Sequence, residues 1–359
     1  MKKNGVTVAS DSFLLKNHDT GRTSLGKYDE GFHQNEKFLL REWWYFNVIF
    51  NSPKSDLKNW IFKCSINSAV DNDSIKFFLH DANNQTLGSL YVKPKGETIA
   101  STPGVDAHFG NSFIKGMYPK WSVHMENTGF DDTELIADVT FSAKTKPLWI
   151  FKNTGKNLST SSFGYYLVMN VAAKGTIQID NQKYEVEGLG YYDHTWSPYA
   201  KIGGEKSNLR GNVWDWLLVR LDNGLNYFIA KIYPNTRSFF PVFIPGYFLC
   251  YADDGSFLEN YLFYMKYNQF MDSKKTHLRI PTNIDIKSLQ MISRHSFPYK
   301  TPLYFDFNYQ IKNIHEYIYE KKFDFGQWDS IGTINAKITS RSERKQITGL
   351  GIMEYMTYL

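Results

Sequence analysis

The sequence is poor in cysteine and in long apolar runs, and each shortage excludes a class of protein. Its 359 residues include two cysteines, Cys64 and Cys250, far apart in apolar segments. This pattern predicts two buried thiols rather than a disulfide or a Cys-x-x-Cys metal or redox site. The longest apolar stretch, residues 239–251, contains Pro241 and Pro245 and is too short to span a bilayer. We therefore expect no stable membrane insertion.

Charge of one sign is also scarce. The 41 basic and 36 acidic residues leave a formal net charge of +5, with both signs mixed along the chain. Nucleic-acid binders gather basic residues on one surface, so we expect no nucleic-acid partner. The N-terminal residues MKKNGVTVASDSF lack the continuous apolar stretch of a secretory signal. We expect a soluble, cytoplasmic protein, and the oligomeric state stays open.

Aromatic residues, in contrast, are abundant at 17% of the chain. Val, Ile, Tyr, Phe and Thr gather in short runs bounded by Gly, Asn, Asp and Pro, which favours strands over helices. Helical periodicity is weak, and only residues 257–270 and 313–319 leave room for a short helix. Strands are predicted at residues 40–50, 60–66, 75–80, 86–92, 112–117, 121–126, 134–143, 165–171, 175–179, 184–192, 213–221, 226–233, 241–251, 283–289, 303–309, 331–339 and 346–355.

A Gly-Leu-Gly motif occurs twice in the chain. Gly349 follows Gly188 by 161 positions, and an acid stands at the same offset after each motif, Asp193 and Glu354. Two aromatic strands, with the sequences EWWYF and VWDWL, also recur at a separation of 171 positions. These spacings predict two duplicated units, each of which begins with a Trp-rich strand and ends with a Gly-Leu-Gly strand.

The predicted units are all-β. Length alone favours two domains, and we place an N-terminal arm at residues 1–37, a first barrel at 38–200 and a second at 201–359. Many antiparallel strands with few helices favour closed or nearly closed barrels, because closure removes exposed strand edges. Barrels of about eight strands hold side chains or one small ligand.

The first candidate site is the strand that begins at Glu42. Alternation places Glu42, Trp44 and Phe46 on one face and Trp43, Tyr45 and Asn47 on the other. Core packing, with Glu42 paired to an arginine such as Arg41 or Arg210, competes with a catalytic role for this carboxylate.

The second candidate site is the sequence GYYDHTW at residues 190–196. A regular strand would put His194 on one face and Asp193 on the other, so that both could not enter one cavity. Either the strand ends or bulges here, with Pro198 favouring an end near Trp196, or one of the two residues is structural. An Asp-His pair among aromatic rings suits general acid–base catalysis; a structural hydrogen bond between the two is the alternative.

Three motifs together, REWWYFNV, GLGYYDHTW and GLGIMEY, resemble the hydroxyneurosporene synthase (carotenoid 1,2-hydratase) and AttH-like family of double lipocalin-like proteins. The resemblance covers about residues 38–357 and implies two lipocalin-like antiparallel β-barrels in tandem. Fungal decalin-forming Diels–Alderases share this architecture. It further implies an apolar, aromatic-lined cavity for a large hydrophobic substrate and no cofactor. One departure is Ser197-Pro198, which stands where the family has glycine after its Trp.

The resemblance implies that Asp193 donates a proton to a terminal alkene. We predict Asp193, His194 and Glu42 as catalytic residues and no metal site, since His80, His108 and His124 lack short ligand spacing. The predicted substrate-binding residues are Trp43, Trp44, Tyr45, Tyr191, Tyr192, Trp196, Trp214 and Trp216.

The predicted function is a cofactor-independent cyclase or hydratase that acts on a hydrophobic natural-product intermediate. The departure at Ser197-Pro198 favours cyclisation. The alternative is a lipocalin-like carrier that binds an apolar ligand without chemistry. Between the two copies of the motif, the surroundings of Asp193 make it the better candidate for catalysis than Glu354.

Overall fold

The computed structural model consists of β-strands, which confirms the all-β prediction. The described residues are 23–33, 40–52, 55–69, 72–81, 86–126, 133–153, 163–198, 213–233, 242–273, 275, 278–291, 303–318 and 325–358. Within these ranges no helix is long and apolar enough to cross a membrane. Cys64 and Cys250 are both buried and free, as predicted.

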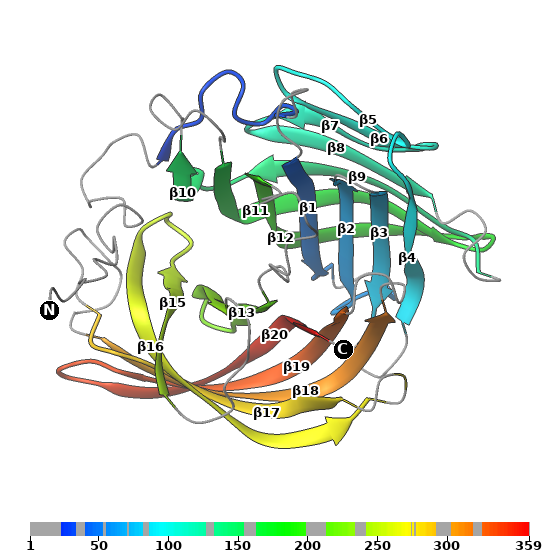
Figure 1. Cartoon of the computed structure of the whole chain (residues 1–359). Coiled ribbons are helices and arrows are strands. Elements are labelled where there is room, and N and C mark those ends of the chain that lie inside the picture. Colours follow the sequence, from blue (N-terminus) through cyan, green and yellow to red (C-terminus); the bar gives the residue numbers. More distant parts are fainter. Residues whose placement is uncertain are drawn as a thin grey trace, which may run out of the picture. The chain divides into compact units, whose positions relative to one another are not determined.

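The first sheet has the strand order β4-β3-β2-β1-β12-β11-β9-β8-β7-β6-β5, with β10 paired to β11 (Figure 1). Its strands are β1 (Leu40–Phe50), β2 (Ile61–Ser68), β3 (Asn72–His80), β4 (Thr86–Pro94), β5 (Thr98–Ala100), β6 (Val105–Phe109), β7 (Ser112–Met117), β8 (Lys120–Glu126), β9 (Leu135–Ala143), β10 (Leu148–Asn153), β11 (Phe163–Ile179) and β12 (Gln182–Pro198). The two edge strands, β4 and β5, are consecutive in the chain. The turn between them is fixed by the Asp73 carboxylate, which accepts hydrogen bonds from the backbone N–H groups of Gly96 and Thr98.

The second sheet is a closed antiparallel barrel, β13 to β20 in chain order (Figure 1). Its strands are β13 (Val213–Leu221), β14 (Asn226–Tyr233), β15 (Val242–Tyr251), β16 (Phe257–Asp272), β17 (Arg279–Ser288), β18 (Tyr304–Ile318), β19 (Phe325–Thr339) and β20 (Arg344–Tyr358). Closure pairs β20 with β13, so this sheet has no unpaired edge.

Contacts divide the chain into two compact units. The first contains Met1–Asp56, Lys63–Phe77 and Ser89–Tyr199, and the second contains Leu57–Phe62, Phe78–Gly88 and Ala200–Leu359. The first unit holds most of the twelve-stranded sheet, and the second holds the closed barrel.

The two segments that left room for a helix are strands, β16 and the end of β18. In β16 the buried side chains Phe263, Met265 and Tyr267 alternate with more exposed residues, which is the period of a strand. Aromatic side chains suit this pleated, half-buried surface and outweigh the weak helical pattern.

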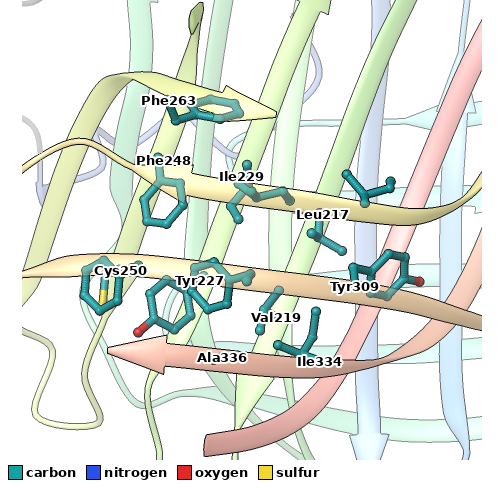
Figure 2. Close-up of a cluster of buried hydrophobic side chains, with 14 of the residues drawn as sticks. Leu217, Val219, Tyr227, Ile229, Phe248, Cys250, Phe263, Tyr309, Ile334 and Ala336 are labelled. Atoms are coloured by element: carbon teal, nitrogen blue, oxygen red, sulfur yellow. The ribbon is translucent and has the colours of Figure 1, made fainter. Parts of the chain in front are cut away.

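The interior of the closed barrel is packed with apolar side chains. Figure 2 shows Tyr227, Phe248 and Cys250 together between the strands. The Tyr227 ring lies 5.2 Å from that of Phe305 and 4.7 Å from that of Phe307, both edge to face. Edge-to-face contacts are favourable for aromatic rings, so these residues form a stable core.

The two Gly-Leu-Gly strands pair with the two Trp-rich strands in the same register. Val48 faces Gly190 across β1 and β12, and Val219 faces Gly351 across β13 and β20. Val219 follows Val48 by 171 positions and Gly351 follows Gly190 by 161, the two offsets found in the sequence. The internal repeat is therefore a repeat of strand pairing.

The Gly-Leu-Gly motif requires glycine because two backbones lie very close together there. A Cβ added at Gly190 would lie 1.9 Å from the carbonyl oxygen of Asn47, and one at Gly349 would lie 2.2 Å from that of Arg220. No other residue fits so close to a neighbouring strand without a shift of its backbone. The motif thus allows β12 to pair closely with β1, and β20 to pair closely with β13.

Residues 23–33, from the predicted N-terminal arm, pack against the sheet of the first unit. The indole of Trp149 donates to the carbonyl oxygen of Ser24 at 2.9 Å, and that of Trp44 donates to the carbonyl oxygen of Glu30 at 3.0 Å. The remainder of the arm, residues 1–22 and 34–37, lies outside the described residues.

Candidate functional site

The predicted site residues of the first unit come together where β1 pairs with β12. Glu42 faces Trp196, Trp44 faces His194 and Tyr45 faces Asp193. β12 continues as a strand to Pro198, so the alternation predicted for a regular strand holds. Asp193 and His194 therefore point to opposite faces of the sheet, and their hydrogen-bond partners differ.

Asp193 belongs to a network of aromatic donors, here called the Asp193 network: Trp43, Tyr165, Tyr191 and Asp193. The Asp193 carboxylate accepts hydrogen bonds from the Trp43 indole at 3.1 Å and the Tyr191 hydroxyl at 2.7 Å. The Tyr165 hydroxyl lies 2.9 Å from that of Tyr191 and 3.5 Å from the carboxylate. The Asp193 side chain is only 5% exposed.

This network can hold and pass protons. Hydrogen bonds donated to a carboxylate favour its charged form. Burial, then the charge of Asp193, raises the pKa of Tyr191 well above its usual value, so its hydroxyl keeps its proton. The arrangement presents a carboxylate that can accept a proton and phenol groups that can donate hydrogen bonds.

The opposite face carries a second polar group, here called the Glu42–histidine cluster: His33, Glu42 and His194. Oε1 of Glu42 lies 2.8 Å from Nδ1 of His33 and 2.9 Å from Nε2 of His194. The His33 backbone N–H donates to Oε2 at 3.0 Å. Glu42 and His194 are almost completely buried. The expected arginine partner of Glu42 is replaced by these two histidines; Arg41 lies over the Trp43 ring, and Arg210 is outside the described residues.

The protonation of this cluster follows from burial and hydrogen bonding. Burial raises the pKa of Glu42, but hydrogen bonds from His194 and His33 outweigh it and hold that pKa below its usual value. Burial lowers the pKa of His194. Both directions favour an ionised Glu42 beside a neutral imidazole near pH 7.

A third polar group, Glu30, was not predicted from the sequence. Its carboxylate accepts from the Tyr118 backbone N–H at 2.5 Å, the Trp121 indole at 3.0 Å and the Tyr166 hydroxyl at 3.4 Å. Burial raises the pKa of Glu30 from 4.5 to about 7, against the lowering effect of these hydrogen bonds. Residues 23–33 carry no periodic pattern, so nothing in the local sequence marks Glu30 as buried.

Glu30 also lines a pocket of about 370 Å³ in the first unit. The pocket is lined by Thr23, Ser24, Leu25, Gly26, Lys27, Glu30, Met117, Tyr118, Lys146 and Pro147. Its lining mixes polar and apolar groups, and none of the predicted substrate-binding residues belongs to it.

The predicted substrate-binding residues divide between the faces and the units. Trp43, Tyr45 and Tyr191 share the face of Asp193, whereas Trp44, Tyr192 and Trp196 share that of His194. Trp214 and Trp216 lie on β13 in the second unit, where Trp216 pairs with Glu354.

The three histidines considered for a metal have separate partners. His80 contacts the hydroxyl of Thr86, His108 contacts Asp106, and His124 contacts Asp138 and Glu126. Among the described residues, the group of three ligand-type side chains that does gather is the Glu42–histidine cluster.

Comparisons with known proteins identify similar folds but no related sequence. No family model matches the sequence, and no curated protein does. A protein of Nitrosomonas europaea with the provisional name AttH has a similar structure, with a TM-score of 0.66 and 14% identity over 95% of this chain and 99% of that chain.

Kievitone hydratase from Nectria haematococca is similar at a TM-score of 0.58 and 13% identity, over 88% of both chains. CghA is similar at a TM-score of 0.58 and 11% identity, over 89% of this chain and 88% of that chain. These identities show the fold alone. The chain therefore has the fold of the AttH-like double lipocalin-like proteins.

Proposed function

We propose that this chain is a cofactor-independent enzyme that cyclises or hydrates a large hydrophobic natural-product intermediate. The observation that carries the proposal is the Asp193 network, a buried carboxylate surrounded by aromatic donors. A buried carboxylate with fixed donors suits proton transfer to or from a bound substrate. Aromatic rings around it suit an apolar substrate and stabilise developing positive charge.

The donors in the network support cyclisation in particular. The Tyr165 and Tyr191 hydroxyls form a chain that ends at Asp193. A hydroxyl that leaves this chain when the substrate binds can polarise a substrate carbonyl, while the rings hold the chain of the substrate in its reactive conformation.

The structural neighbours are consistent with both reactions. One is named as a hydratase of kievitone, and CghA is a Diels–Alderase. Both share the fold with this chain at identities of 13% and 11%. Under this proposal, kievitone and linear polyenes are the first compounds to test as substrates.

A turnover assay tests the proposal. The full chain is incubated with kievitone, with a linear carotenoid and with a linear polyene that carries a diene and an activated alkene. Hydration adds the mass of one water, whereas cyclisation leaves the mass unchanged and removes ultraviolet absorption of the diene. We expect one of these products to form faster than without protein.

The variant Asp193→Asn separates an enzyme from a carrier. For the enzyme, turnover falls while ligand affinity, measured by quenching of tryptophan fluorescence, stays close to that of the wild type. Binding of these compounds without any conversion would favour the carrier and contradict the proposal. Equal turnover in both proteins would remove Asp193 from the mechanism.

A further inference from the structure

The two ring nitrogens of His194 both face oxygen atoms that accept hydrogen bonds. Nδ1 lies 3.1 Å from the backbone carbonyl oxygen of Asp29, and Nε2 lies 2.9 Å from Oε1 of Glu42. Both oxygens accept, whereas a neutral imidazole carries a single N–H, so in either tautomer one ring nitrogen turns its lone pair toward an oxygen. Both contacts are favourable only when the ring binds a further cation, which is a second proton or a metal ion at Nε2.

A second imidazole points at the same oxygen. Nδ1 of His33 lies 2.8 Å from Oε1 of Glu42, and the three ligand-type atoms all lie within 4.8 Å of one another. Two ligand atoms bound about 2.0–2.1 Å from one ion are about 3 Å apart at right angles and about 3.4 Å apart in a tetrahedron. The two separations from Oε1 of Glu42, 2.8 and 2.9 Å, are close to the first value. A second proton on His194 satisfies only its own contact with Glu42, whereas a metal ion would bind both imidazoles and the carboxylate at once.

The surroundings hold both imidazoles in place. The Trp196 ring stacks on His33 at 3.6 Å with an interplanar angle of 5°, and the Trp44 ring stacks on His194 at 5.1 Å and 20°. Metal-binding histidines characteristically donate their other ring N–H to a carbonyl or carboxylate, as His194 does to Asp29. The carboxylate is oriented too, because the His33 backbone N–H donates to its second oxygen.

We propose that His33, Glu42 and His194 bind one divalent transition-metal ion through two imidazole nitrogens and one carboxylate oxygen. This donor set suits Zn²⁺ and Fe²⁺. The three ligands come from the segment 23–33, β1 and β12. The ion therefore fastens the N-terminal segment to the sheet of the first unit. The sequence predicted no metal, because His33 lies 161 positions from His194 and outside any ligand-like spacing.

The metal site is independent of the proposed function. Glu42 and His194 point to the face of the sheet opposite Asp193. Its role is to stabilise the first unit, so it is tested by measuring metal binding and not turnover.

Metal titration of the stripped protein tests the site. The full chain, without a histidine tag, is dialysed against a chelator and titrated with Zn²⁺, Co²⁺, Fe²⁺ and Mn²⁺. The visible spectrum of Co²⁺ reports nitrogen ligands, and X-ray absorption of the Zn²⁺ form counts the imidazoles. We expect one ion per chain, a melting temperature that rises with the ion concentration, and two imidazoles in the bound form.

Two histidine variants make the test specific. His33→Gln removes one ligand at a half-buried position and should weaken binding by at least about 100-fold, and the Zn²⁺ form should lose one imidazole. His124→Gln is the matched control, because His124 also contacts two carboxylates, at 2.7 and 3.0 Å, but on β8. It should bind like the wild type, as should Asp193→Asn.

Several outcomes would overturn the proposal. Absence of stoichiometric binding, or equal binding by the wild type and His33→Gln, would assign the cation between His194 and Glu42 to a proton. Circular dichroism of both variants shows whether they fold. Because His33 is 16% exposed and lies outside the strands, His33→Gln tests the site even where variants of Glu42 or His194 fail to fold.

Discussion

Tyr45 faces Asp193 across β1 and β12, and Trp216 faces Glu354 at the corresponding place across β13 and β20. Both acids stand at the same distance after a Gly-Leu-Gly motif. Around Asp193 the donors are an indole and a phenol, whereas Glu354 accepts a hydrogen bond from the side-chain amide of Gln327 at 3.2 Å. The repeat has kept the backbone pairing of the two copies, while the groups that could perform chemistry differ.

The opposite faces of the same strands differ as well. Trp44 and His194 pair in the first unit, and Asp215 and Tyr355 occupy the corresponding positions in the second. Asp215 is buried and accepts a hydrogen bond from the Tyr267 hydroxyl. A carboxyl group is therefore tolerated inside either unit when it has a hydrogen-bond partner. What distinguishes the first unit is the clustering of histidine and carboxylate.

The largest expected difference between the copies is in turnover. On a substrate accepted in the assay above, Asp193→Asn should lower the rate by about 10³-fold, or about 4 kcal/mol, because it removes a group that transfers a proton. Glu354→Gln should stay within about twofold of the wild type. Steady-state rates of both variants give the comparison. Equal losses in the two variants would mean that the copies are functionally equivalent.

Substitution of the motif glycines should destabilise the two copies to a similar extent. Gly188→Ala and Gly349→Ala, at corresponding positions, each place a Cβ against a backbone carbonyl, at 2.4 and 2.2 Å. Each should lower the free energy of unfolding by about 3 kcal/mol, measured by urea denaturation.

Gly110→Ala is the control for these substitutions. Gly110 has a φ of +59° and open space around an added Cβ. Its substitution therefore reports backbone strain alone and should cost about 1 kcal/mol. A loss as small as this in Gly188→Ala would show that the strands can move apart and that the close approach is not required.

A pH-dependent part of the stability should arise from Glu30. Its pKa is raised to about 7 by burial, so the folded chain binds this proton more tightly than the unfolded chain. The contribution is fully present below pH 4.5 and is lost as the pH rises through 7, about 2 kcal/mol between pH 5 and 8. Glu30→Gln cannot ionise, so the fall in its urea midpoint over this range should be smaller. Parallel pH profiles of the two proteins would contradict the assignment.

Much of the frame is encoded locally and could be predicted. Runs of aromatic and aliphatic residues mark β1 and β13, whose observed bounds match the predicted ranges. The Gly-Leu-Gly motif also predicted the duplication, whereas the pairing of its strand with the Trp-rich strand is known from the structure. The short strands β5, β6 and β10 were missed, since three to six residues carry too little periodicity to be recognised.

The side chains of the site were only partly predictable. Alternation correctly separated Asp193 from His194, but it could not show which residues complete each group. Glu30 and His33 belong to a segment without periodicity, and their positions depend on contacts with strands that are distant in sequence. Such contacts are decided by the packing of the whole unit and leave no local pattern.

The smallest expected effect lies within the Asp193 network itself. Tyr191→Phe removes the 2.7 Å hydrogen bond to the carboxylate and should lower turnover about tenfold, the value of one hydrogen bond to a charged group. Tyr165→Phe removes a 2.9 Å hydrogen bond with the Tyr191 hydroxyl and a 3.5 Å contact with the carboxylate. It leaves the shorter bond from Tyr191 to Asp193 in place and should cost about twofold. Both substitutions keep the aromatic ring, so the two variants differ from the wild type in a hydroxyl and not in packing. Because residue 352, the counterpart of Tyr191 in the second unit, is an isoleucine, this phenol is part of what separates the two copies. A larger loss in Tyr165→Phe than in Tyr191→Phe would place the substrate-facing hydroxyl on Tyr165 and reverse the order of the proton path.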